Sequence, residues 1–157
     1  MLNFSASWQP AVELVDGSSQ NLVYTVKDFE TIVAEPGVYV FSRMFGETVS
    51  PLYIGETTNI QKRIRQHTET NVRLMNGIKA SGRGRKVVLY CTVSTSSIKR
   101  RDSMLAILQR GVIEHALSEG HDLLNVQLTK LSVHSVQFTG NQLSGQLAPR
   151  KMYIRGA

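Results

Sequence analysis

The chain has 157 residues, a formal net charge of +6 at neutral pH and a hydrophobic fraction of 41%. This length suits one compact domain with extensions, and no apolar run approaches the ~20 residues that a membrane-spanning helix needs. The single cysteine, Cys91, excludes a disulfide framework and is expected to be a small core residue.

The first 34 residues are expected to form an amino-terminal extension. Alternating apolar residues over 10–26 flank the turn-forming run 16–19 and predict a β-hairpin. Residues 28–34 allow one or two helical turns, which Pro36 would end. The start shows no basic stretch followed by an apolar one, so we expect no secretory signal and a cytoplasmic protein, associated with the nucleoid if the source is bacterial.

A second hairpin and a helix are predicted next. Residues 38–43 alternate as a strand, a glycine- and proline-containing loop follows, and residues 52–55 resume an extended chain. A helix is predicted over 59–69, because Asn59 is a competent N-cap and two isoleucines follow at a spacing of four. Arg63 and His67 are also four residues apart and therefore share another face of this helix.

The second half of the chain begins less clearly. Residues 70–82 are compatible with a loop or a short helix, and they end in a flexible cationic run. The β-branched residues over 87–95 then predict a strand. The longest helix is predicted over 98–118, with a broad apolar face and with Glu114 at the edge of that face.

A carboxy-terminal extension is expected from residue 127 to residue 157. Residues 132–138 read as a strand, and a polar loop and a basic tail follow. This extension and the amino-terminal hairpin are the candidates for a homodimer interface.

The basic residues are concentrated in one part of the chain. Residues 61–101 carry eleven Lys and Arg against a single acid, Glu69. Such clustering predicts a polyanionic partner, because each neutralised phosphate releases condensed counterions. An ordinary solvated basic face, or a surface for an acidic protein, is the alternative. The expected phosphate contacts are Lys62, Arg65, Arg83, Arg85, Lys86, Arg100 and Arg101.

Two tripeptides on the predicted second hairpin carry the strongest functional signal. Gly37-Val38-Tyr39 and Tyr53-Ile54-Gly55, followed at once by the basic helix, resemble the signature of the GIY-YIG nucleases. The resemblance spans about residues 35–126 and is similar to the nuclease domain of the bacterial-type excision-repair endonuclease and to restriction and homing endonucleases. It implies an α/β fold, an α+β sandwich with a small, mostly antiparallel central sheet flanked by helices.

The resemblance also implies roles for particular side chains. Tyr39 would take a proton from the attacking water, Tyr53 would hold the phosphate or the water, and Arg63 would clamp the phosphate. Glu114 would hold a divalent cation, Mg²⁺ or Mn²⁺, and Asn125 would brace the site by hydrogen bonds. These groups are expected to converge on one pocket.

Two positions depart from the usual pattern. Glu56 stands where the repair branch often has lysine, and a carboxylate facing the substrate phosphate would repel it. His67 stands where that branch favours tyrosine, and with an ordinary pKa near ~6.5 it could share or replace the proton-accepting role of Tyr39.

The sequence therefore predicts a divalent-metal-dependent endonuclease that hydrolyses DNA phosphodiester bonds, with RNA left open as a substrate. The first alternative is a module of the same fold that binds nucleic acid without cutting it, and Glu56 favours that alternative. Without their neighbours, Tyr39 and Tyr53 would read as ordinary half-buried strand residues.

Overall fold

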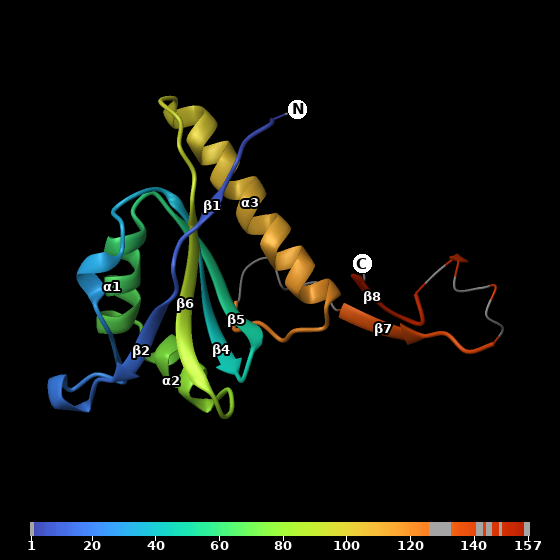
Figure 1. Ribbon diagram of the computed structural model, residues 1–157, viewed down its shortest axis with the longest axis horizontal. Coiled ribbons are helices and arrows are strands. Elements are labelled where there is room, and N and C mark those ends of the chain that lie inside the picture. The colour runs from blue at the N-terminus through green and yellow to red at the C-terminus, as the bar shows by residue number, and fades with distance from the viewer. Residues whose placement is uncertain (1, 126–132, 141–142, 144–145, 148, 156–157) are drawn as a thin grey trace.

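The computed structural model describes residues 2–125, 133–140, 143, 146–147 and 149–155. An antiparallel sheet stands between two helical layers (Figure 1). Its strands run in the order β3 (Tyr24–Val26), β2 (Val12–Asp16), β6 (Arg85–Thr92), β4 (Gly37–Phe45) and β5 (Thr48–Thr57), and β1 (Ser7–Trp8) also pairs with β6. The expected fold class is confirmed.

The side chains of β4 alternate between the two faces of the sheet. Tyr39 and Phe41 belong to one buried cluster, whereas Val38 and Val40 belong to another. This period of two is what a strand buried on both faces requires. Each helical layer therefore packs against its own set of strand residues.

Two short helices cover the first face, and one long helix covers the second (Figure 1). The first pair is α1 (Ile60–Thr70) and α2 (Val72–Ala80), and the second face carries α3 (Ile98–Ser118). Each has a side-chain N-cap: the Asn59, Asn71 and Ser97 oxygens each accept a hydrogen bond from a backbone N–H three residues on. Residues 70–82, for which the sequence allowed a loop or a helix, form a helix because Asn71 starts a new one.

β5 lies at the edge of the sheet, which explains two irregularities. The pairing of β4 with β5 shifts between Phe41 and Ser42, so that Ser42 faces Pro51 and Phe41 faces Tyr53. Proline cannot donate to a sheet hydrogen bond, and an edge strand with a bulge tolerates it. The outer backbone of β5 remains available to other parts of the chain.

The predicted amino-terminal hairpin is present, and it joins the central sheet. β2 and β3 pair across the short 3₁₀ helix η1 (Ser18–Gln20), and β2 also pairs with β6. A second 3₁₀ helix, η2 (Phe29–Thr31), provides the helical turn expected before Pro36.

A separate two-stranded sheet of β7 (Val133–Gln137) and β8 (Lys151–Arg155) projects away from the main body (Figure 1). The strand expected over 132–138 matches β7, while β8 replaces the expected loop-like basic tail. Residue 132 and several others of the predicted extension lie outside the described residues. Within the described part of the chain, no helix combines the length and apolar character needed to cross a bilayer.

Candidate active site

Tyr39 and Tyr53 lie on neighbouring strands beneath α1 and α2. Tyr39 is 1% exposed and Tyr53 is half-buried, and their ring centroids are 6.4 Å apart. Because both residues sit at positions of the same parity on paired strands, their side chains leave the sheet on the same face. The two phenols that the sequence singled out are therefore brought together.

Gly55 is the direct neighbour of Tyr39 across β4 and β5. A Cβ atom at Gly55 would overlap the Tyr39 hydroxyl and ring. The absence of a side chain lets the phenol lie over β5 and reach α1. The glycine of the Tyr53-Ile54-Gly55 run is thus needed for space at this site.

Gly55→Ala should therefore damage the site and the fold together. The tyrosine is held by its packing and cannot retreat freely, so we expect a loss of stability of roughly 1–3 kcal/mol, as for overpacked cores. Urea unfolding of the variant and the wild-type protein measures it. Gly111→Ala is the matched control, because nothing lies within 4 Å of the added methyl group and the helix should be stabilised or unchanged. Equal stability of Gly55→Ala and the wild type would contradict the packing account.

His67, on the last turn of α1, forms a hydrogen bond with Tyr39. Tyr39 Oη and His67 Nε2 are 2.7 Å apart, and His67 is 6% exposed. Burial lowers the pKa of His67 to about 4, and the positive charge of Arg63 acts in the same direction. His67 is therefore neutral at physiological pH, with one ring nitrogen carrying a proton.

Asn71 determines which ring nitrogen carries that proton. Its Oδ1 accepts the hydrogen bond from Leu74 N at 3.1 Å that caps α2, which orients the amide. Its Nδ2 then faces His67 Nδ1 at 3.2 Å. An amide NH₂ can only donate, so Nδ1 is the acceptor and the proton lies on Nε2. In this arrangement His67 donates to the oxygen of Tyr39 and cannot take the proton of the phenol.

Arg63 lies one helical turn before His67 and is exposed at its guanidinium end. Burial raises the pKa of Tyr39 well above its usual range, the nearby Arg63 opposes this shift, and Tyr53 and Glu56 reinforce it. The phenolate of Tyr39 is therefore disfavoured by burial, while Arg63 and the N–H of His67 are the groups that stabilise it.

A cavity of about 520 Å³ opens beside these residues. Four of its polar lining residues are Tyr53, Arg63, Arg73 and Gln109, and Leu74, Gly77 and Leu124 form an apolar wall. The side chains of Asn71 and Asn125 complete the lining. This volume accommodates a phosphate group together with part of its nucleotide.

Asn125 holds the edge of β5 next to the cavity. Its Oδ1 accepts a hydrogen bond from Ile54 N at 2.9 Å, and its Nδ2 donates to Ile54 O at 2.7 Å. The amide thus imitates a neighbouring strand at the one residue that lies between Tyr53 and Gly55. This is the geometry of a brace for the strand that carries Tyr53.

Glu114 is not brought to this cavity. It is exposed, and it lies five residues after Gln109, which places it about 140° around α3 from the cavity-lining glutamine. Tyr39 faces the α1 and α2 layer, while α3 covers the opposite face of the sheet. The expectation that the five groups share one pocket is met by the tyrosines, Arg63 and His67, and not by Glu114.

Gln109 is the α3 residue that reaches the cavity, and it was not among the residues predicted from the sequence. Its Nε2 donates to Ile54 O at 3.4 Å. The signal available in the sequence was a polar residue within the core-facing stripe of the helix, since Leu105 and Ala116 lie on the same side. Asn71 and Arg73 were also missed, because residues 70–82 could not be assigned to a helix.

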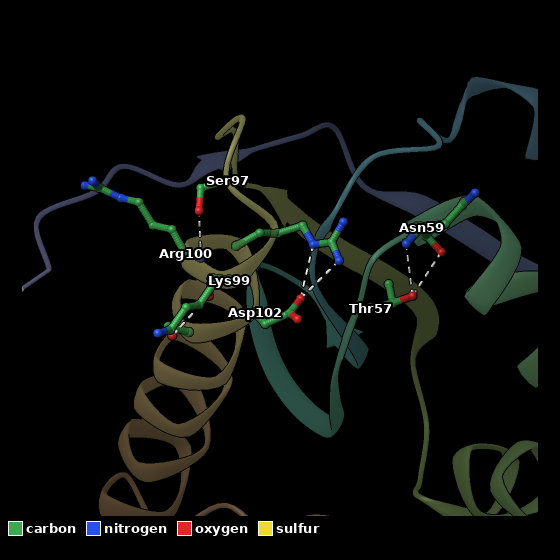
Figure 2. A network of polar contacts seen from close by, with 8 residues as sticks. Thr57, Asn59, Ser97, Lys99, Arg100 and Asp102 are labelled. Carbon is green, nitrogen blue, oxygen red and sulfur yellow. Dashed lines mark hydrogen bonds and ion pairs between the residues drawn. The ribbon is translucent and has the colours of Figure 1, made fainter.

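The carboxylate nearest to this group is Glu56. Burial raises the pKa of Glu56, Asp102 on α3 raises it further, and Arg63 lowers it. Asp102 also accepts hydrogen bonds from Arg101, with the shorter distance 3.1 Å, at the start of α3 (Figure 2). In the described part of the chain no cluster of three or more His, Cys, Asp or Glu is arranged to hold a metal ion.

The basic residues expected to contact phosphates differ in their availability. Lys62, Arg83 and Arg100 are exposed. Arg85 pairs with Glu13 at 3.2 Å, Arg101 pairs with Asp102, and Arg65 lies over the ring of Phe29 at 4.4 Å. These three already have partners, although surface pairs of this kind exchange readily.

Lys86 is a correction to the expected phosphate contacts. It is 6% exposed, and its ammonium group donates to Gly82 O at 2.6 Å and to Ser81 Oγ at 3.2 Å. It therefore anchors the loop between α2 and β6 and does not present its charge to a ligand.

A scan against protein-family models matched residues 35–101 to one model, described as the GIY-YIG catalytic domain. No curated protein and no solved structure matched the chain. The matched segment contains both tripeptides, α1, α2 and β6, and it ends in the first turn of α3.

Proposed function

The chain belongs to the GIY-YIG nuclease superfamily through residues 35–101, and on that premise we propose that it is an endonuclease that hydrolyses phosphodiester bonds of DNA. The observation that supports this most is the 2.7 Å contact between the Tyr39 hydroxyl and His67 Nε2, beside Arg63. A buried phenol that is hydrogen-bonded to a neutral imidazole and lies close to a guanidinium is an uncommon arrangement for a purely structural core.

Each group has a chemical task in this proposal. Arg63 binds the nonbridging oxygens of the scissile phosphate, because its planar fork matches phosphate geometry. Tyr53 donates a hydrogen bond to the phosphate or to the water. Tyr39, as the phenolate, takes a proton from the attacking water, and His67 Nε2–H stabilises that phenolate. Asn125 keeps the strand that carries Tyr53 in place.

The assignment of Tyr39 as the base predicts the pH dependence of cleavage. Burial raises the pKa of Tyr39, so the phenolate is a minor form at neutral pH and its fraction grows about tenfold per pH unit. The single-turnover cleavage rate should therefore keep rising from pH 6 to pH 9. If His67, with its pKa of about 4, were the base, the rate would be level above about pH 5. A flat profile over that range would contradict the role of Tyr39.

A divalent cation was expected from the family, whose nucleases generally use one. The donor set of this cavity does not fit such an ion. Mg²⁺ is usually held by one or two carboxylates, whereas the cavity presents two guanidinium groups and no carboxylate. The proposed reaction steps therefore use the side chains alone, and the requirement for Mg²⁺ or Mn²⁺ is left to experiment.

The activity can be tested with supercoiled plasmid and purified protein in Mg²⁺, in Mn²⁺ and in EDTA. We expect nicked or linear product from the wild-type protein and at least about a hundredfold less from Arg63→Ala, since the phosphate clamp is lost. Arg150→Ala removes the same charge from the exposed segment before β8 and should cleave normally. No cleavage under all three conditions, or equal cleavage by Arg63→Ala, would refute the proposal.

A second candidate function is the binding of nucleic acid without cleavage. The specific observation that favours it is the cavity wall of α3, which contributes Gln109 and no acid. Salt-dependent DNA binding without any product in the plasmid assay would establish this function. Running labelled RNA in parallel decides between the two nucleic acids.

A further inference from the structure

One residue of α3, Gln109, decides what the candidate active site can hold. Its amide nitrogen is fixed on Ile54 O, and within the described structure its Oε1 has no hydrogen-bond partner. The helix rotates about 100° per residue, so positions that are not near Gln109 on the helical wheel point elsewhere. Asp102 is on the same side seven residues earlier, but it lies ~10 Å further along the axis and is paired with Arg101.

The charges around the cavity are all of one sign. Arg63 and Arg73 line it, and no Asp or Glu does. All twelve acidic residues of the chain lie within the described residues, so no undescribed segment can supply a carboxylate. A cation placed in this cavity would face two guanidinium groups.

The remaining oxygen atoms of the cavity do not compensate. The amide oxygens of Asn71 and Asn125 already accept hydrogen bonds from Leu74 N and Ile54 N. The oxygens left to face the cavity are the neutral Oε1 of Gln109 and the hydroxyl of Tyr53. A neutral amide and a phenol next to two positive charges are a poor site for Mg²⁺ and a good site for an anion.

We propose that this cavity binds a phosphate group of nucleic acid directly through Arg63 and Arg73, and that Gln109 leaves it without a divalent cation. The inference rests on the proposed function for the identity of the anion. The apolar wall of Leu74, Gly77 and Leu124 then packs against the sugar or base attached to that phosphate. Cleavage by this site proceeds without a metal bound in the cavity.

The proposal predicts that a single substitution creates a cation site. Gln109→Glu places a carboxylate at the α3 wall of the cavity, in the one position from which the helix reaches it. Gln20→Glu makes the same change of charge in η1, at an exposed residue away from the cavity. The free Mn²⁺ signal in electron paramagnetic resonance measures cation uptake without DNA and without any need for activity.

Wild-type protein and Gln20→Glu should take up no Mn²⁺ at a specific site, whereas Gln109→Glu should bind one ion per chain. Fluorescence anisotropy with a labelled DNA duplex is the second measurement. Wild-type affinity should be equal in EDTA and in Mg²⁺ at matched ionic strength. Gln109→Glu should bind DNA roughly tenfold more weakly in EDTA and recover in Mg²⁺, because its carboxylate repels the phosphate until a cation is bound.

The proposal is overturned if the wild-type protein binds one Mn²⁺ and loses it in Glu56→Gln or Glu114→Gln. It is also overturned if wild-type DNA binding requires Mg²⁺ at matched ionic strength. Both outcomes are read from the wild type and its acid-to-amide variants, so they hold even if Gln109→Glu does not fold. A protein that neither takes up Mn²⁺ nor binds DNA refutes the proposed function itself, a result distinguishable from cation uptake by the wild type.

Discussion

Tyr39→Phe should reduce DNA cleavage by at least about a thousandfold while leaving DNA affinity within about threefold of the wild type. The substitution removes only the phenolic oxygen, which is the proton acceptor in the proposed reaction and is 2.7 Å from His67 Nε2. It leaves Arg63 and the exposed basic residues intact, and these supply the affinity for phosphates. Single-turnover cleavage and fluorescence anisotropy on the same DNA separate the two effects.

Tyr90→Phe is the control for this substitution. Tyr90 is buried on β6, pairs with Tyr39 across the sheet and belongs to the same core cluster. Its hydroxyl has no role in the proposed chemistry, so its removal should leave cleavage unchanged. Tyr39→Phe should also lower stability by about 1 kcal/mol, because the His67 N–H loses its acceptor. Equal cleavage by Tyr39→Phe and wild type would remove the tyrosine from the mechanism.

Asn71→Asp should exchange the protonated nitrogen of His67 and slow cleavage by up to about a hundredfold. Aspartate keeps an oxygen for the N-cap of α2 but replaces the NH₂ group that faces Nδ1 with an acceptor. His67 must then carry its proton on Nδ1, and Nε2 becomes an acceptor for the Tyr39 hydroxyl. The phenolate would lose its hydrogen-bond donor, and losses of about ten- to a hundredfold are typical when a supporting hydrogen bond of this kind is removed.

Nitrogen-15 NMR of histidine-labelled protein reports the exchange directly, because protonated and unprotonated ring nitrogens have well-separated shifts. The pKa of His67 should also rise above its wild-type value of about 4, since the new carboxylate stabilises the imidazolium. Asn59→Asp is the matched control, because Asn59 caps α1 in the same way and has no histidine contact. An unchanged His67 spectrum in Asn71→Asp would show that Asn71 does not set the tautomer.

Much of the fold could be predicted from the sequence because its signals are local. The alternation of residues on β4, the N-cap at Asn59 and the apolar face of α3 each depend on neighbours a few residues away. The junction at Asn71 was harder to interpret, because the same residue ends α1 and begins α2. The pairing of the amino-terminal hairpin with β6 depends on contacts far apart in the chain, which periodicity does not report.

The candidate site could be predicted only where its residues lie on one short segment or on paired strands. Tyr39, Tyr53, Arg63 and His67 meet because the β4 and β5 pair and α1 follow one another directly. The contribution of α3 depends on how the helix is rotated against the edge of β5. Its apolar stripe is broad, so the sequence did not distinguish the side of Gln109 from that of Glu114, although they differ by about 140°.

The buried Lys86 shows the same limit for charge. Its position in a run of glycines and bases suggests a solvated loop, yet the loop folds back and supplies its own acceptor, Gly82 O. Burial lowers the pKa of Lys86, and the neighbouring charge of Arg43 lowers it further. Charge counts alone therefore overestimate the surface that can meet phosphates.

The claim that Tyr39 activates water for a direct attack on phosphorus is tested most directly by the stereochemistry of cleavage. A DNA duplex with a phosphorothioate of one configuration at the cleaved position is cut in ¹⁸O-labelled water, and the configuration of the product phosphorus is determined. One direct displacement by water inverts the configuration, and inversion is the result expected here. Retention would mean that Tyr39 or another side chain attacks first and forms a covalent intermediate, which would contradict the role assigned to the phenol.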